Sequence, residues 1–72
     1  MTRMYERVML VRPLPLDFDD NVMDVGSEAT VVDLVDFDVV LLEFDFDDPA
    51  LEGEKSFKSA LATVHDFVSV QA

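Results

Sequence analysis

The chain of 72 residues contains no cysteine, so neither a disulfide bond nor a thiolate metal site supports its core. A single domain of this length, residues 1–72, buries only about 60% of the surface that its unfolded chain exposes, which makes the core marginal. Half of the residues are hydrophobic, which is typical of a globular domain and not of a disordered tail. Stability must therefore come from apolar packing, and the sequence leaves open whether a homodimer adds to it.

Basic residues are also scarce in this sequence. Five Lys and Arg stand against sixteen Asp and Glu, which gives a formal net charge of −11 at pH 7. The segment 17–54 contains fourteen of these carboxylates and no Lys or Arg at all. Such a surface repels nucleic acid and anionic membranes and attracts basic protein surfaces. The competing interpretation is that the acidity serves solubility alone.

Long apolar runs and catalytic motifs are also missing. No run approaches the roughly 20 residues that a membrane-spanning helix needs, and the N-terminal segment lacks the apolar region of a signal peptide. These absences predict a cytoplasmic protein with no membrane partner. His65 is the only histidine, and there is neither a glycine-rich phosphate loop nor a nucleophile elbow. We therefore expect no enzyme and no cofactor.

One acidic stretch has a partial metal-binding pattern. Asp17, Asp19, Asn21 and Glu28 have the spacing of ligands in an EF-hand calcium loop. However, Val22 stands where the sharp turn of that loop requires glycine. A solvated acidic loop is therefore the prediction, and no metal site is assigned.

The chain is organised around residues 26–46, which read as two β-strands that fold back at residues 36–38. In the second strand the apolar residues at positions 40, 42, 44 and 46 alternate with a row of carboxylates, Glu43, Asp45 and Asp47. This alternation predicts a half-buried antiparallel strand with its acidic face toward water. No cation lies near this row in the sequence. For the first strand, parity does not decide which face of residues 30–35 is buried.

The remaining segments are shorter. Proline at positions 13 and 15 ends the first strand. Residues 57–64 fit both helical and strand periodicity, so the pattern leaves this segment open. The expected elements are a strand at 6–12, a long loop at 13–25 whose Leu14, Leu16, Val22 and Val25 pack under the sheet, a polar loop at 47–56, a single helical turn near residues 65–67 and a last short strand at 68–71.

Several short motifs along the chain occur in the same order in a known family. They are Tyr5, Val8 and Leu10, then Leu14-Pro15, then Gly26 with Thr30-Val31-Val32, then Leu42-Glu43-Phe44, and finally Ala62-Thr63-Val64 with Asp66-Phe67-Val68. In these residues the chain resembles a family of small uncharacterised bacterial and phage SH3-like proteins; Ala29 departs from the family pattern, which has a second glycine there. The resemblance implies an all-β fold, a small five-stranded SH3-like barrel with long acidic loops, and a strand at 57–64. It implies no activity, because such barrels serve as binding modules or as appendages of enzymes.

Two phenylalanines stand between aspartates, in Asp17-Phe18-Asp19 and Asp36-Phe37-Asp38. An aromatic ring flanked by carboxylates is a suitable anchor for a partner pocket rimmed by Lys and Arg. The alternative is that both rings cover the small core. The predicted partner-binding residues are Asp17, Phe18, Asp19, Asp36, Phe37, Asp38, Glu43, Asp45, Asp47 and Asp48.

Two hypotheses about function follow. The first is a non-enzymatic interaction protein whose acidic surface binds a basic protein surface without contacting nucleic acid directly. Its most specific form is a nucleic-acid mimic that inhibits a defence complex, in the manner of an anti-CRISPR protein. The second is an SH3-like accessory module docked on an enzyme or transporter, in which the acidity serves solubility only.

Overall fold

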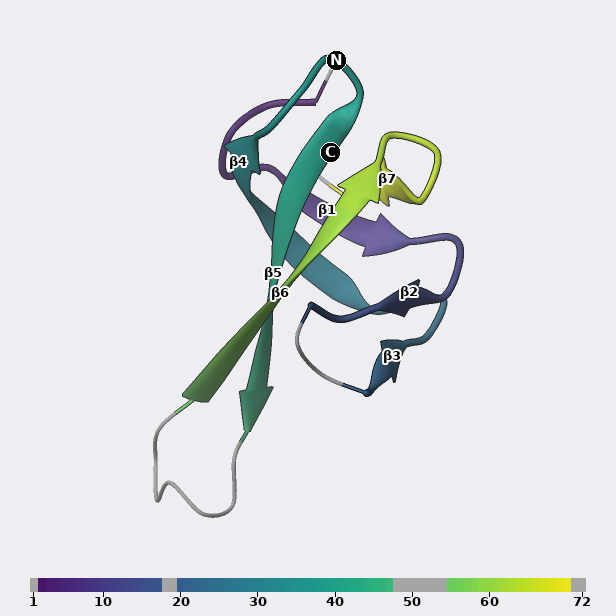
Figure 1. Ribbon diagram of the computed structural model, residues 1–72, viewed down its shortest axis with the longest axis vertical. Coiled ribbons are helices and arrows are strands. Elements are labelled where there is room, and N and C mark those ends of the chain that lie inside the picture. The colour runs from purple at the N-terminus through teal and green to yellow at the C-terminus, as the bar shows by residue number, and fades with distance from the viewer. Residues whose placement is uncertain (1, 18–19, 48–54, 71–72) are drawn as a thin grey trace.

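The computed structural model describes residues 2–17, 20–47 and 55–70, except for the side chains at 46, 47 and 55. All regular structure in this part of the chain is β-strand, with no helix (Figure 1). The strands are β1 (Arg7–Leu10), β2 (Leu14–Pro15), β3 (Val22–Met23), β4 (Glu28–Leu34), β5 (Val39–Asp47), β6 (Lys55–Thr63) and β7 (Phe67–Ser69). The prediction of an all-β fold is confirmed.

Five of these strands form one antiparallel sheet in the order β6-β5-β4-β1-β7, and β2 pairs with β3 in a separate two-stranded sheet. The ladders leave β6 and β7 as the two edges, so the pairings do not close into a ring. In Figure 1 the far ends of β5 and β6 extend away from the other strands. One end of the sheet is therefore formed by β5 and β6 alone.

The hairpin of β4 and β5 is the centre of this sheet, as the sequence predicts. Gly26 precedes it with a φ of 94°, a left-handed conformation that glycine adopts without strain, and its N–H donates to the carbonyl of Leu10 over 2.9 Å. Ala29, where the resembled family has a second glycine, is fully buried within β4. Glycine is not needed there, because Ala29 pairs with Val8 in an ordinary ladder.

A register shift between Val31 and Asp33 answers the question that parity left open for β4. Ala29 and Val31 point into the core, whereas Thr30 pairs across the sheet with Arg7 on one side and Glu43 on the other. The shift has the form of a β-bulge, which changes the faces of the residues that follow it. We call the side of the sheet that carries Arg7, Thr30, Glu43 and Asp45 the outer face.

Residues 57–63 form most of β6, as the family resemblance implies, and Val64 begins the turn that follows. β6 pairs with β5 at nine successive positions, from Lys55 to Thr63. Ala60 and Ala62 are buried, whereas Phe57 and Leu61 are exposed on the outer face. The small alanine side chains fit the core face, where Leu42 and Phe44 of β5 and other large apolar side chains already fill the space.

Two local predictions are wrong. Residues 64–66 form a β-turn in place of a helical turn, because Asp66 N–H donates to the carbonyl of Thr63 (3.0 Å) and the Asp66 carboxylate accepts from Thr63 N–H (2.9 Å). Asp66 thus closes the connection between two paired strands, and Phe67 is already part of β7.

The long loop at 13–25 is partly regular, since Leu14–Pro15 pairs with Val22–Met23. Leu14 and Leu16 are buried as expected, but Val22 and Val25 are exposed. Pro15 is tolerated because a strand of a two-stranded pair has a free edge where no N–H is needed.

The core lies between the five-stranded sheet and the segment of β2 and β3. Phe44 is its largest fully buried side chain, with no exposed surface. The buried residues are Val8, Leu10, Leu14, Leu16, Ala29, Val31, Val40, Leu42, Phe44, Ala60, Ala62 and Phe67, with Met23 packed against them. Most are small or of medium size, so this core holds a compact domain together without a large reserve of buried apolar surface.

Candidate functional site

The turn between β4 and β5, residues 35–38, carries the most exposed aromatic side chain among the described residues; we call it the hairpin tip. Val35 N–H and Asp36 N–H both donate to the carbonyl of Val39, each over 3.0 Å. An Asp36 carboxylate oxygen accepts from Phe37 N–H over 2.7 Å. Short polar side chains that bond to the next backbone amides are a common means of fixing a turn.

Phe37 leaves the hairpin tip with a relative exposure of 101%, so no atom of the described chain covers its ring. The Phe37 ring therefore does not cover the core, which was the alternative interpretation. The tip is also tied to the neighbouring turn, because Val64 N–H donates to the carbonyl of Asp38 over 3.1 Å. Phe37 is thus an exposed ring held on an ordered backbone.

A hollow of ≈ 380 Å³ opens beside the tip. We call it the tip hollow. Its walls are mainly apolar, and Asp36 contributes a carboxylate. The lining residues are Thr2, Leu34, Asp36, Phe37, Val40 and Val64.

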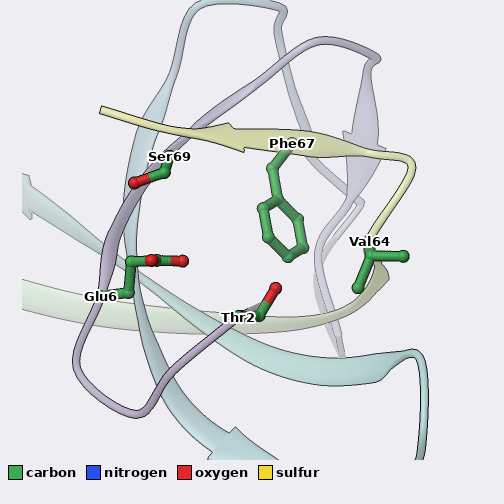
Figure 2. A pocket seen from close by; sticks show the side chains of 5 residues that line it. All are labelled: Thr2, Glu6, Val64, Phe67 and Ser69. Atoms are coloured by element: carbon green, nitrogen blue, oxygen red, sulfur yellow. The ribbon is translucent and has the colours of Figure 1, made fainter. Parts of the chain in front are cut away.

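A second hollow of ≈ 370 Å³ adjoins the first, since Thr2 and Val64 line both. We call it the Glu6 hollow. In Figure 2 the Phe67 ring reaches into it from β7, and the side chains of Glu6 and Thr2 reach in from the segment before β1. Ser69 completes the lining.

The predicted partner-binding residues do not form one patch. Asp36, Phe37 and Asp38 lie together at the hairpin tip, whereas Glu43 and Asp45 lie further along β5 on the outer face. β5 has nine residues, so its last Cα lies about 27 Å from its first at about 3.4 Å per residue. The predicted residues therefore occupy two separate positions along the hairpin.

The other predicted residues have separate positions. Asp17 follows Leu16 of the core and its N–H donates to the carbonyl of Ser59 in β6 over 2.9 Å, so its backbone holds the β2 segment against the sheet. Asp47 is the last residue of β5, and its side chain is not described. Phe18, Asp19 and Asp48 lie outside the described residues.

No cation lies near the row of carboxylates on β5 in the sequence, but the fold brings Arg7 to Asp45. Arg7 of β1 donates from Nη1 to Thr30 Oγ1 over 3.1 Å, and the same nitrogen lies 3.6 Å from Asp45 Oδ1. Arg7 Nε lies 3.6 Å from Glu28 Oε1. Arg7 is far from Asp45 in sequence, and only the order β1-β4-β5 brings the two together.

The lining of the two hollows includes residues that sequence reasoning did not assign to a site, namely Thr2, Glu6, Leu34, Val64 and Phe67. No local motif identifies them. They come together because β1 pairs with both β4 and β7, which places the segment before β1 between the hairpin tip and β7. These lining residues can therefore be identified from the order of the strands, and not from any local sequence motif.

Within residues 2–17, 20–47 and 55–70, no three His, Asp or Glu side chains gather as a metal site would require. Of the residues with EF-hand spacing, Glu28 is paired with Arg7 and Asp19 is not described. His65 is exposed on the turn before β7. No helix in the described part of the chain is long and apolar enough to cross a membrane.

No protein-family model, curated protein or solved structure matches this chain.

Proposed function

We propose that this chain is a non-enzymatic interaction domain that binds a basic surface of another protein through its hairpin tip. The observation that carries the proposal is the complete exposure of Phe37 on an ordered turn. Burying a phenylalanine side chain is worth about 1.5–3 kcal/mol, so a ring left entirely in water has much to gain from a partner pocket. Exposed aromatic rings of this kind are frequent binding hot spots.

The charges around Phe37 indicate the chemistry of the partner. Asp36 and Asp38 flank the ring and are exposed, and the whole chain carries a formal net charge of −11. A basic surface would be attracted over a distance and then meet the ring and its two carboxylates at short range. Protein surfaces that ordinarily bind nucleic acid have this character, so the proposed partner is a nucleic-acid-binding protein whose Lys and Arg side chains accept carboxylates in place of phosphates. Inhibition of such a protein, for example in a defence complex, would follow by competition.

For the fold, we propose an SH3-like arrangement. The strand order β6-β5-β4-β1-β7 and the β2–β3 excursion between β1 and β4 support it, together with contacts between β2 and β6. Nuclear Overhauser contacts between Met9 and Val68 and between Asp17 and Ser59 would test the two connections on which this arrangement depends.

A second candidate is an accessory module docked on an enzyme or transporter. Phe57 and Leu61 favour it, because both expose apolar side chains on the outer face, with relative exposures of 60% and 51%. Docking through this face would depend on apolar contact and little on salt.

Capture of proteins from the lysate of the native host distinguishes the two candidate functions. Three immobilised proteins are compared: the wild type, Phe37→Ala and Phe57→Ala. The proposed function expects a protein that the wild type and Phe57→Ala retain, that Phe37→Ala loses and that moderate salt elutes. The accessory-module candidate expects the reverse dependence on the two rings and resistance to salt. Equal retention by all three proteins would contradict both, and unchanged circular dichroism of the variants is the control for folding.

A further inference from the structure

We propose that the tip hollow and the Glu6 hollow form one groove that binds an extended basic segment of the partner protein. One cationic side chain would lie against Glu6 and a second against Asp36, with an apolar side chain between them over Val64. This proposal rests on the proposed function, because it names the part of the partner that the hairpin tip would meet.

Continuity of the two hollows is the first argument. Thr2 and Val64 line both, so an occupant that crosses these two residues is in contact with both hollows. The volumes, ≈ 380 and ≈ 370 Å³, are each of the size that holds several side-chain atoms. A single small ion would leave most of this space empty, whereas a chain segment would fill it.

The distribution of polar and apolar side chains is the second argument. Leu34, Val40 and Val64 form apolar walls in the tip hollow, and Phe67 does so in the Glu6 hollow. The carboxylates lie apart, Asp36 in the tip hollow and Glu6 in the Glu6 hollow. Lys and Arg side chains suit such a groove because their methylene stems pack on apolar walls while the charged ends reach carboxylates.

The Glu6 end also offers an aromatic ring beside a carboxylate. In Figure 2 the ring of Phe67 and the side chain of Glu6 border the same space from opposite sides. A cation placed there would be attracted by the Glu6 carboxylate and by the Phe67 ring at once. An anionic occupant such as nucleic acid would be repelled by both carboxylates of the groove.

The backbone before β1 holds Glu6 in this position. Tyr5 has a φ of 62°, which is uncommon for a residue with a side chain and turns the chain sharply. Hydrogen bonds hold this turn on β4: Tyr5 N–H donates to the carbonyl of Val31 over 2.6 Å, and Val31 N–H donates to the carbonyl of Glu6 over 2.9 Å. Such conformations persist only where surrounding contacts maintain them, and they concentrate at functional sites.

The test uses end-capped synthetic peptides with the purified full chain. Each peptide has two lysines with one leucine between them, at spacings that place all three side chains on the same face of an extended strand. A second set has glutamine in place of both lysines. Binding is followed by the amide shifts of the ¹⁵N-labelled protein during titration.

We expect at least one lysine peptide to shift the amides of Thr2, Glu6, Leu34, Val64 and Phe67 in preference to others, and the glutamine set to shift none. Glu6→Gln should weaken binding about fivefold, the upper range for one exposed ion pair. Asp33→Asn removes the same charge from an exposed position outside the groove and should change the affinity less than twofold. Val64→Ser should weaken binding, while Val25→Ser, an exposed valine elsewhere, should not.

Shifts spread over all carboxylate-bearing segments, with equal effects of Glu6→Gln and Asp33→Asn, would overturn the groove, because they indicate general charge attraction only. The same holds if no lysine peptide binds. If the groove fails in this way while capture still depends on Phe37, the proposed function stands without it. If the peptides bind as expected but capture does not depend on Phe37, the groove is a site for basic segments and the proposed function fails. Retention of the wild-type amide spectrum shows that each variant is folded.

Discussion

At the hairpin tip, Asp36 and Asp38 lie in solvent on either side of an exposed phenyl ring, whereas on the outer face Glu28 and Asp45 lie on either side of Arg7. The carboxylates of both regions belong to the same hairpin, whereas Arg7 comes from β1. On the outer face Glu28 and Asp45 each lie 3.6 Å from a nitrogen of Arg7, and Thr30 accepts a hydrogen bond from the same guanidinium. At the tip, the Asp36 carboxylate bonds only to the backbone of its own turn among the contacts described.

The comparison indicates that a high acidic content does not give every carboxylate the same role. Paired carboxylates on a sheet contribute to the fold, and their availability to a partner is reduced by the pairing. Carboxylates on a turn with an exposed ring contribute little to the fold and remain available. Variants that affect one region and leave the other unchanged can test this division.

The largest effect is expected at the tip. The double variant Asp36→Asn and Asp38→Asn should slow association with the captured basic partner about tenfold at low ionic strength, because steering charges next to the anchor are lost. Stopped-flow kinetics measure this rate. The matched double variant Asp24→Asn and Asp33→Asn has the same net charge. If it associates as slowly as the tip variant, the association rate depends on total charge and not on the position of the carboxylates.

The next effect concerns the outer face. Arg7→Gln should lower the free energy of unfolding by about 1 kcal/mol, since two partly exposed ion pairs contribute about 0.2–1 kcal/mol each. For a domain of this size, that corresponds to a melting temperature lower by about 4–8 °C. Thermal denaturation by circular dichroism measures the shift. Arg12→Gln, at an exposed turn, is the control, and a similar shift in that variant would mean that the Arg7 contacts contribute nothing specific.

A smaller effect distinguishes the hydrogen bond that Asp36 accepts from the charge that it carries. Asp36→Ala removes the acceptor for Phe37 N–H and should cost about 0.5 kcal/mol, at the lower end for a hydrogen bond because the group is exposed. Asp36→Asn keeps an acceptor oxygen and should melt as the wild type does. If the two variants have equal melting temperatures, the bond to Phe37 N–H does not stabilise the turn.

The smallest effect is that of salt on stability. Because the formal net charge is −11, added salt at neutral pH should raise the melting temperature by screening repulsion among carboxylates. The rise should be larger in Arg7→Gln, where Glu28 and Asp45 have lost the cation between them. A fall in melting temperature with salt would mean that attractive pairs outweigh repulsion even in this acidic chain.

The sequence was informative where local alternation decides the structure. The row of apolar residues in β5 correctly predicted which side of that strand is buried, and the position of the turn at residues 36–38 followed from it. Alternation failed for β4, because the bulge after Val31 changes parity in the middle of the strand. It also could not decide between helix and strand for residues 57–64, since that choice depends on pairing with β5.

For the candidate site, the sequence could single out Phe37 by its aspartate neighbours but could not show that its ring is exposed. The pairing of Arg7 with Asp45 and the meeting of Thr2 with Val64 depend on segments distant in the chain. Neither has a local signal, because both arise from strand order and from the turn at Tyr5.

The position of β1 between β4 and β7 has a consequence for how the protein is made. On the ribosome, β1 emerges early and can pair with β4 once the central hairpin has formed, but its other side has no neighbour until residues 67–69 have been synthesised. Until then, the backbone groups of Arg7, Met9 and Val11 that later meet β7 and its flanking residues are an unprotected strand edge. Until residues 67–69 are available, this edge of the nascent chain can pair with other chains, and strand pairing over such a long separation is intrinsically slow.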